Sequence, residues 1–221
     1  MPRRRGEAVL PSLEEIFKHA AETKKKQLQL VEIKYLKAQN LGLYPQASID
    51  HWLDIAATEG YTSHIILHRN NGLRRIVSHL IGQKTGVYVL KQEAEPNATP
   101  PQVKIHLNCE EINEGFARHP LLHWLGAYEQ SHQELLSKLK IWCTEKGNRD
   151  PLMLFYEEDI ERSPLRGYQR VCDYLSLTLE TPSVSLKRIN DRPLVDIIEN
   201  YEEVDIHLRG TEFAWMLNEN G

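Results

Sequence analysis

Residues 64–79 read HIILHRNNGLRRIVSH, and this stretch decides the expected fold. The apolar run at 64–68 is short and bounded by turn signals, which is typical of a strand buried in a parallel sheet. The Asn-Asn-Gly sequence at 70–72 predicts a turn. Apolar residues then recur at helical spacing, at Leu73, Ile76, Val77, Leu80 and Ile81. The stretch therefore predicts a strand, a turn and a helix in succession.

The rest of the chain alternates predicted strands and helices. Apolar and β-branched runs predict strands at 28–35 and 152–156. Amphipathic spacing, capping residues and closing glycines predict helices at 13–26, 48–58, 121–145, 163–175 and 193–208. The proline-rich residues 92–104 predict a loop. We therefore expect residues 1–221 to form one α/β domain, a three-layer αβα arrangement with a mainly parallel sheet, preceded by a helix and basic segment at 1–27.

The composition excludes several classes of protein. The 221 residues carry a net charge of −4, and this mild acidity argues against a general nucleic-acid binder. Three scattered cysteines, Cys109, Cys143 and Cys172, argue against a disulfide framework or a zinc site. The sequence contains no apolar run of membrane-spanning length, and its basic start is not followed by an apolar segment. We therefore expect a cytoplasmic protein with no membrane span.

Positive charge is concentrated around the first strand and helix. Residues 60–92 contain no Asp or Glu, whereas the chain average of 31 acids in 221 residues would place about four or five there. The same stretch holds five basic residues, namely Arg69, Arg74, Arg75, Lys84 and Lys91. Open α/β sheets bind ligands where strands end and helices begin, and free N–H groups at a helix start favour anions. The pattern predicts an anion site there.

Three side chains are the candidates for this anion site. Arg69 ends the strand, and Arg74 and Ser78 share one flank of the helix because they are four residues apart. A phosphate could meet the guanidinium of Arg69, backbone N–H groups from Asn71 onward and the Ser78 hydroxyl. The alternative interpretation is a solvated helix that carries ordinary surface arginines and a serine.

The amino-acid sequence of residues 64–79 resembles the 3′-phosphate-binding motif of sulfotransferases that use 3′-phosphoadenosine 5′-phosphosulfate (PAPS). In that family an Arg at a strand end and a Ser about two helical turns later bind the 3′-phosphate of the nucleotide. The paired arginines before Ser78 resemble the bacterial and algal branch, which includes nodulation-type enzymes. The resemblance implies a fold like that of P-loop NTPases, with Arg69 and Ser78 as nucleotide ligands.

Two later blocks resemble the same family. Residues 154–160 (LFYEEDI), followed by YLSL at 174–177, are similar to its strand–YEDL–helix–FLGL region. Residues 185–190 (SLKRIN) and 198–211 are similar to its C-terminal N-Y-D-E-V and L-x-G-T segments. The resemblance spans roughly residues 28–217. It implies transfer of a sulfuryl group from PAPS to a hydroxyl of a carbohydrate or small metabolite, without a metal, and with Lys187 and Arg188 closing on the nucleotide.

One family feature has no counterpart in the sequence. The family's 5′-phosphosulfate loop, of the form R-S-G-[ST]-x-x-L, is not found, and residues 4–7 are the only basic stretch with a glycine near the start. Either the gene model starts late, or the protein has lost half of the nucleotide site. The second alternative predicts a catalytically inactive remnant that binds a nucleotide or serves as an interaction module.

Sulfuryl transfer to a hydroxyl also needs a general base within hydrogen-bond reach of the acceptor. The nominal candidates are His51, His64, His68 and Glu32, and Lys34 is a candidate for stabilising the transferred charge. Side chains alternate along a strand, so His68 is expected on the face opposite Arg69. The acidic residues 157–159 are expected to be architectural rather than catalytic. The acceptor, the base and the oligomeric state stay open.

Overall fold

The computed structural model describes residues 49–88, 90–91, 102–114, 117–182, 186–187 and 192–218. The helix expected at 13–26, the strand expected at 28–35 and most of the loop expected at 92–104 lie outside these ranges. Residues 102–104 belong to no helix or strand. None of the helices in the described part is long and apolar enough to cross a membrane.

The centre of the fold is a parallel pair of strands. Strand β1 (Ile65–His68) pairs with β5 (Leu152–Phe155), in a register that sets Ile65 opposite Leu152 and His68 opposite Phe155. Both strands were expected from their apolar runs, and the mixed α/β class is confirmed. Two short antiparallel pairs were not expected, namely β2 (Leu90–Lys91) with β6 (Leu186–Lys187), and β3 (Ile112–Glu114) with β4 (Ala117–His119).

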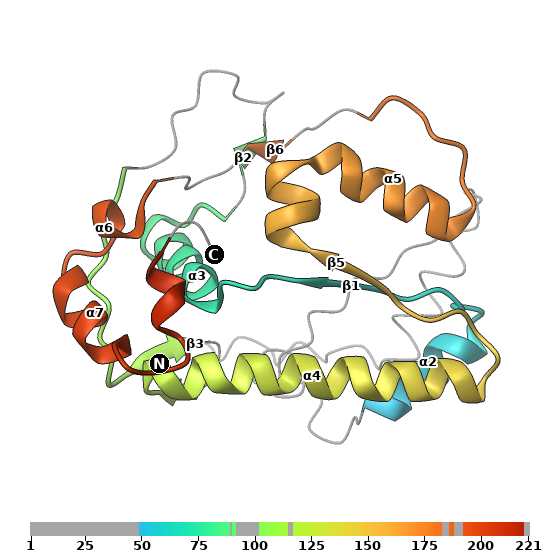
Figure 1. The fold of residues 1–221 in the computed structure, drawn as a ribbon, viewed down its shortest axis with the longest axis horizontal. Coiled ribbons are helices and arrows are strands. Elements are labelled where there is room, and N and C mark those ends of the chain that lie inside the picture. Colours follow the sequence, from blue (N-terminus) through green and yellow to red (C-terminus); the bar gives the residue numbers. More distant parts are fainter. Residues whose placement is uncertain are drawn as a thin grey trace, which may run out of the picture.

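Helices lie on both sides of this pair (Figure 1). On one side run α4 (Leu121–Glu145) and α2 (Ile49–Thr58), and on the other lies α5 (Pro164–Leu175). The bounds of α4 match those predicted. Helix α5 also begins as predicted, because the hydroxyl of Ser163 accepts the backbone N–H of Arg166 and proline occupies the first helical turn. Helix α3 (Gly72–Thr85) connects the end of β1 to the rest of the fold.

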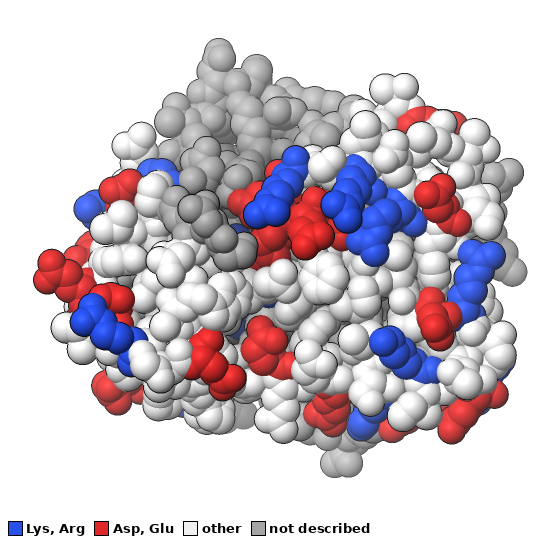
Figure 2. Space-filling view, viewed as in Figure 1, with Lys and Arg blue, Asp and Glu red and all other residues white. Residues whose placement is uncertain are grey.

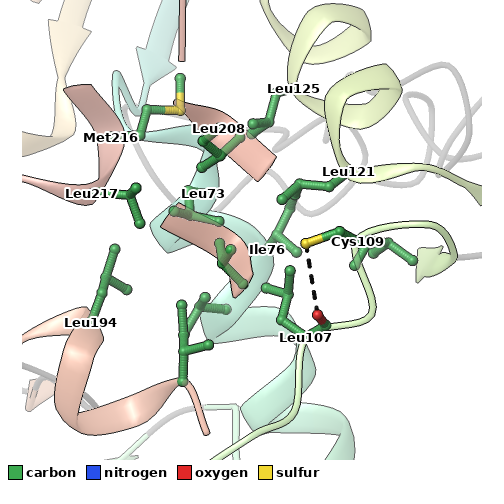
Figure 3. Close-up of a cluster of buried hydrophobic side chains, with 14 of the residues drawn as sticks. Leu73, Ile76, Leu107, Cys109, Leu121, Leu125, Leu194, Leu208, Met216 and Leu217 are labelled. Carbon is green, nitrogen blue, oxygen red and sulfur yellow. Dashed lines mark hydrogen bonds between the residues drawn. The ribbon is translucent and has the colours of Figure 1, made fainter. Parts of the chain in front are cut away.

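The long helix α4 is shared by two apolar clusters. Its first turns, with Leu121 and Leu125, join α3 and the C-terminal helices in a large core, part of which is drawn in Figure 3. Its last turns, with Leu139 and Trp142, pack against α2 and against Ile66 of β1. Burial of these clusters provides the main stabilising free energy and holds β1, α3 and α4 in fixed relative positions.

The single helix expected at 193–208 is wrong. The chain instead forms α6 (Leu194–Ile197) and α7 (Tyr201–Leu208), followed by a 3-10 turn, η2 (Ala214–Leu217). Between them Ile198 is extended and forms a parallel bridge with Ile105. The side-chain amide of Asn200 donates to the Leu107 carbonyl (3.0 Å) and accepts its N–H (2.9 Å). The N–H of Ile105 also donates to the Ile197 carbonyl, and the Ile105 carbonyl accepts the N–H of Glu199, at 2.8 Å each. An unbroken helix would use both of these backbone groups internally.

Candidate functional site

The carboxyl ends of β1 and β5 lie side by side because the strands are parallel and in register. Beyond β1 the chain turns through residues 69–71 into α3, and beyond β5 it enters η1 (Tyr156–Arg162), one turn of π-helix. Arg69 and Tyr156 are therefore neighbours, and the Cζ atom of Arg69 lies 4.5 Å from the centroid of the Tyr156 ring. This is the edge at which the sequence predicts an anion site.

Side chains from two other elements bind the backbone of the turn. The N–H of Arg69 donates to the Tyr128 hydroxyl of α4 (3.3 Å). The N–H groups of Asn70 and Asn71 donate to the two carboxylate oxygens of Glu157, at 3.1 and 3.0 Å. Glu157 therefore occupies the place at the start of α3 where the sequence pattern predicts a phosphate.

Asn71 completes the start of α3. Its side-chain oxygen accepts the N–H of Arg74 (2.9 Å), and its side-chain NH₂ donates to the carbonyl of Met216 in η2 (2.8 Å). The residue is buried, and both ends of its amide have partners. The expectation that a phosphate meets backbone N–H groups from Asn71 onward is therefore not met at Asn71 itself, because the carboxylate of Glu157 holds that N–H.

Arg69 lies in a half-buried, electrostatically mixed environment. Burial lowers its pKa, the phenol of Tyr156 and the carboxylates of Glu157 and Glu161 oppose this shift, and the positive charge of Arg74 lowers it further. The buried Nε atom of Arg69 has no hydrogen-bond partner in the described part of the protein. A guanidinium with an unused donor beside a second guanidinium is the arrangement that an anion would stabilise.

Arg74 and Ser78 lie on α3, four residues apart and thus on one flank. Arg74 is half-buried and donates through Nη1 to the carbonyl of Arg192 (3.3 Å), whereas Ser78 is exposed. Arg192 in turn donates through Nη2 to the carbonyl of Val103 (2.8 Å). Sequence reasoning missed Arg192, because 118 positions separate it from Arg74 and no local pattern connects them.

The basic residues expected to close on the nucleotide are only partly described. Lys187 lies in β6, where its backbone is paired with that of Leu90 in β2. Arg188 lies outside the described residues. In the described part of this C-terminal segment, the carbonyl of Arg192 accepts a hydrogen bond from Arg74.

Of the acidic residues after β5, Asp159 supports the local structure. Asp159 is fully buried, accepts the N–H of Phe155 (2.9 Å) and forms an ion pair with Arg170 of α5. Burial by itself would raise the pKa of Asp159, but the Phe155 N–H and the Arg170 guanidinium outweigh it and hold the pKa below its usual value. The side chain of Glu158 is exposed and lies 3.8 Å from Arg166.

The fold places negative charge near Arg69, although the sequence around Arg69 contains none. Acidic and basic side chains stand together around η1, between β5 and α5 (Figure 2). Glu157 and Glu161 both act on the charge of Arg69. The stretch 60–92 is free of acids in the sequence, but η1 brings carboxylates to it in space.

The rings of His68, the last residue of β1, and His64, just before β1, pack against side chains of α4. His68 is buried against α4, where its ring stacks on that of His132 with 3.6 Å between centroids, which agrees with the expected face. Burial and the neighbouring His132 lower the pKa of His68 to about 4. His64 packs edge-on against Trp142, and burial lowers its pKa as well. His51 is exposed on α2, and Glu32 and Lys34 lie outside the described residues.

The described residues include no group of three or more His, Cys, Asp or Glu side chains arranged to hold a metal ion. Cys109, Cys143 and Cys172 are buried free thiols. Comparisons of the chain with protein-family models, curated proteins and solved structures found no match.

Proposed function

We propose that this protein binds the 3′-phosphate of an adenosine nucleotide beside Arg69 and acts as a sulfotransferase-like enzyme. In this proposal β1, β5 and their helices belong to a P-loop NTPase-like sulfotransferase fold. The co-substrate is PAPS, and the acceptor is a hydroxyl of a carbohydrate or small metabolite. The proposal rests on the resemblance of three sequence blocks to that family and on one structural observation.

That observation is the state of Arg69. Its guanidinium is half-buried at the carboxyl end of β1, its buried Nε has no partner in the described part, and Arg74 places a second positive charge nearby. Burial and the positive charge of Arg74 both disfavour the charged form of Arg69, and a bound anion would offset them together with Glu157 and Glu161. Ser78 adds an exposed hydroxyl on the same flank of α3 as Arg74. A phosphate dianion matches this set of donors.

The reaction would depend on positioning and on neutralising charge. The acceptor oxygen forms a bond to sulfur as the bond from sulfur to the 5′-phosphate oxygen breaks, and the acceptor proton passes to a base. Adenosine 3′,5′-bisphosphate leaves as the second product. Arg69, Arg74 and Ser78 would hold the 3′ end of the nucleotide in place, which is how a binding group far from the reacting atoms contributes to rate.

Calorimetry with adenosine 3′,5′-bisphosphate tests the binding step. We expect the bisphosphate to bind more tightly than adenosine 5′-monophosphate, which lacks the 3′-phosphate. Arg69→Ala should weaken bisphosphate binding by about 10- to 150-fold, because a hydrogen bond to a charged group contributes about 1.5–3 kcal/mol. Arg209→Ala is the matched control, since Arg209 is exposed just after α7 and pairs with Asp205. Equal binding of the two nucleotides, or none of either, would refute the site.

Transfer is a separate measurement. Incubation with sulfur-labelled PAPS and a panel of glycans and hydroxylated metabolites should yield a labelled acceptor. Binding of the bisphosphate without transfer to any acceptor would instead favour the inactive nucleotide-binding module.

A further inference from the structure

We infer that Glu157 is a specificity-determining residue of this site. Its carboxylate occupies the backbone N–H groups at the start of α3 and thereby excludes free anions from the helix N-terminus. A nucleotide phosphate is then confined to the flank formed by Arg69, Arg74 and Ser78. The part that concerns the nucleotide rests on the proposed function, whereas the exclusion of free anions does not.

The hydrogen bonds show how the carboxylate replaces an external anion. Each oxygen of Glu157 accepts one N–H, from Asn70 at 3.1 Å and from Asn71 at 3.0 Å. Two consecutive N–H groups at the positive end of a helix form the arrangement that binds sulfate or phosphate in other proteins. Further along the helix, the N–H of Gly72 donates to the Asn70 carbonyl (3.1 Å) and the N–H of Arg74 donates to the side chain of Asn71. An added anion would have to displace Glu157 to reach the N–H groups of Asn70 and Asn71.

Glu157 is held on a rigid support. Two residues later, the buried Asp159 accepts the N–H of Phe155 and pairs with Arg170, which also donates to the carbonyl of Met153. The contact between η1 and α5 is so close that a Cβ atom at Gly167 would overlap the carbonyl oxygen of Asp159. These contacts fix η1, and with it the backbone of Glu157, next to the turn before α3.

Two consequences follow for the unmodified protein. Inorganic sulfate or phosphate should bind weakly, because the N–H groups of Asn70 and Asn71 are already occupied by Glu157. A nucleotide phosphate should be selected by Arg69 and its neighbours rather than by the helix N-terminus. Removing the Glu157 carboxylate should free the N–H groups and let any small anion bind there.

The first experiment follows the backbone ¹⁵N–¹H signals of Asn70 and Asn71 while sodium sulfate is added at constant ionic strength. In Glu157→Ala these signals should shift in a saturable way, with a sulfate Kd lower than that of the unmodified protein by about tenfold or more. In Glu157→Gln one acceptor oxygen remains and the charge is lost, so sulfate affinity should rise by about two- to fivefold. Glu158→Gln, on the same turn but paired with Arg166, should behave as the unmodified protein does.

The second experiment compares the affinities of adenosine 3′,5′-bisphosphate and adenosine 5′-monophosphate. The ratio of the two affinities should fall in Glu157→Ala, because the freed N–H groups can donate to the 5′-phosphate of either nucleotide. If Glu157 had only a structural role, Glu157→Ala would weaken the binding of every anion. An increase in sulfate affinity therefore distinguishes the two roles.

Three outcomes would overturn the inference. The first is that the amide signals of folded Glu157→Ala do not respond to sulfate. The second is that the unmodified protein responds equally strongly. The third applies if Glu157→Ala does not fold, and it is an unchanged sulfate affinity in Glu157→Gln. Failure of the proposed function shows separately, as absence of bisphosphate binding by the unmodified protein, and it leaves the sulfate experiment valid.

Discussion

The guanidinium of Arg69 stacks on the ring of Tyr156, with 4.5 Å between the Cζ atom and the ring centroid. Arg69 follows β1 and Tyr156 follows β5, so the parallel pairing of the two strands brings these residues together. The ring holds the guanidinium in one orientation at the edge of the sheet. The Arg69–Tyr156 contact therefore links the packing of η1 to the proposed anion site.

Replacing Tyr156 tests that link. Tyr156→Leu should lower the affinity for adenosine 3′,5′-bisphosphate by about 2- to 30-fold, because a cation–π contact contributes about 0.5–2 kcal/mol. Tyr156→Phe keeps an aromatic face and should retain most of the affinity. Calorimetry of the two variants provides the comparison, and equal affinities in Leu and Phe variants would exclude an orienting role for the ring.

Ser78 offers a test with little effect on the fold. Its side chain is exposed on α3, so Ser78→Ala should change the free energy of unfolding by about 0.5 kcal/mol or less. Loss of a hydroxyl donor to phosphate should weaken bisphosphate binding by about 2- to 10-fold. Ser137→Ala, at an exposed position on α4, is the control. The same loss of affinity in both variants would argue against a contact with the nucleotide.

His68 and His132 should make the protein sensitive to acid. His68 is faced by Tyr128, Glu129 and His132 of α4 and by Glu157 of η1. Burial lowers the pKa of His68 to about 4, below the ordinary value of 6.5, so the unfolded chain binds more protons between these two values. The contribution of neutral, buried His68 to the free energy of unfolding is fully present above pH 6.5 and is lost as pH falls toward 4. For one such group this loss is on the order of 3 kcal/mol.

Urea unfolding between pH 4.5 and pH 7.5 measures this effect. His68→Phe removes the titrating group and should reduce the slope of stability against pH by up to about 1.4 kcal/mol per pH unit. His106→Gln, at an exposed position, should leave the slope unchanged. A slope that is the same in His68→Phe and in the unmodified protein would assign the acid sensitivity to other groups.

Asp159 should be the most sensitive position of η1. Asp159→Asn removes the charge that faces Arg170 in a fully buried place, and we expect a loss of about 2–4 kcal/mol in the free energy of unfolding. Glu158→Gln, one residue earlier and exposed, should cost about 0.5 kcal/mol or less. Denaturant melts of both variants provide the measurement, and a cost for Asp159→Asn as small as that of the control would contradict a supporting role.

Local patterns were sufficient for much of the fold. Helix α4 has the predicted bounds of 121–145, because its amphipathic pattern is long and ends at Lys146 and Gly147. Strands β1 and β5 follow from short apolar runs, and the start of α5 follows from Ser163 and Pro164. In each case the signal lies within the element or at its ends.

Other features depend on contacts between distant residues. The segment between α6 and α7 forms hydrogen bonds with Ile105 and Leu107, which lie some ninety residues earlier in the chain. Strands β2, β3, β4 and β6 are two or three residues long, too short to show a period. Their pairing is decided by the elements that bring them together.

The amino-acid sequence by itself determined that Arg69 ends a buried strand, that Arg74 and Ser78 share a helix flank, and that no acid lies within residues 60–92. Only the tertiary structure decided which groups surround Arg69. The parallel pairing of β1 and β5 brings Glu157 to the N–H groups of Asn70 and Asn71, 86 or 87 positions away along the chain. Electrostatic and hydrogen-bond energies depend on distance in space, so the charge of a site follows from the fold rather than from its own segment.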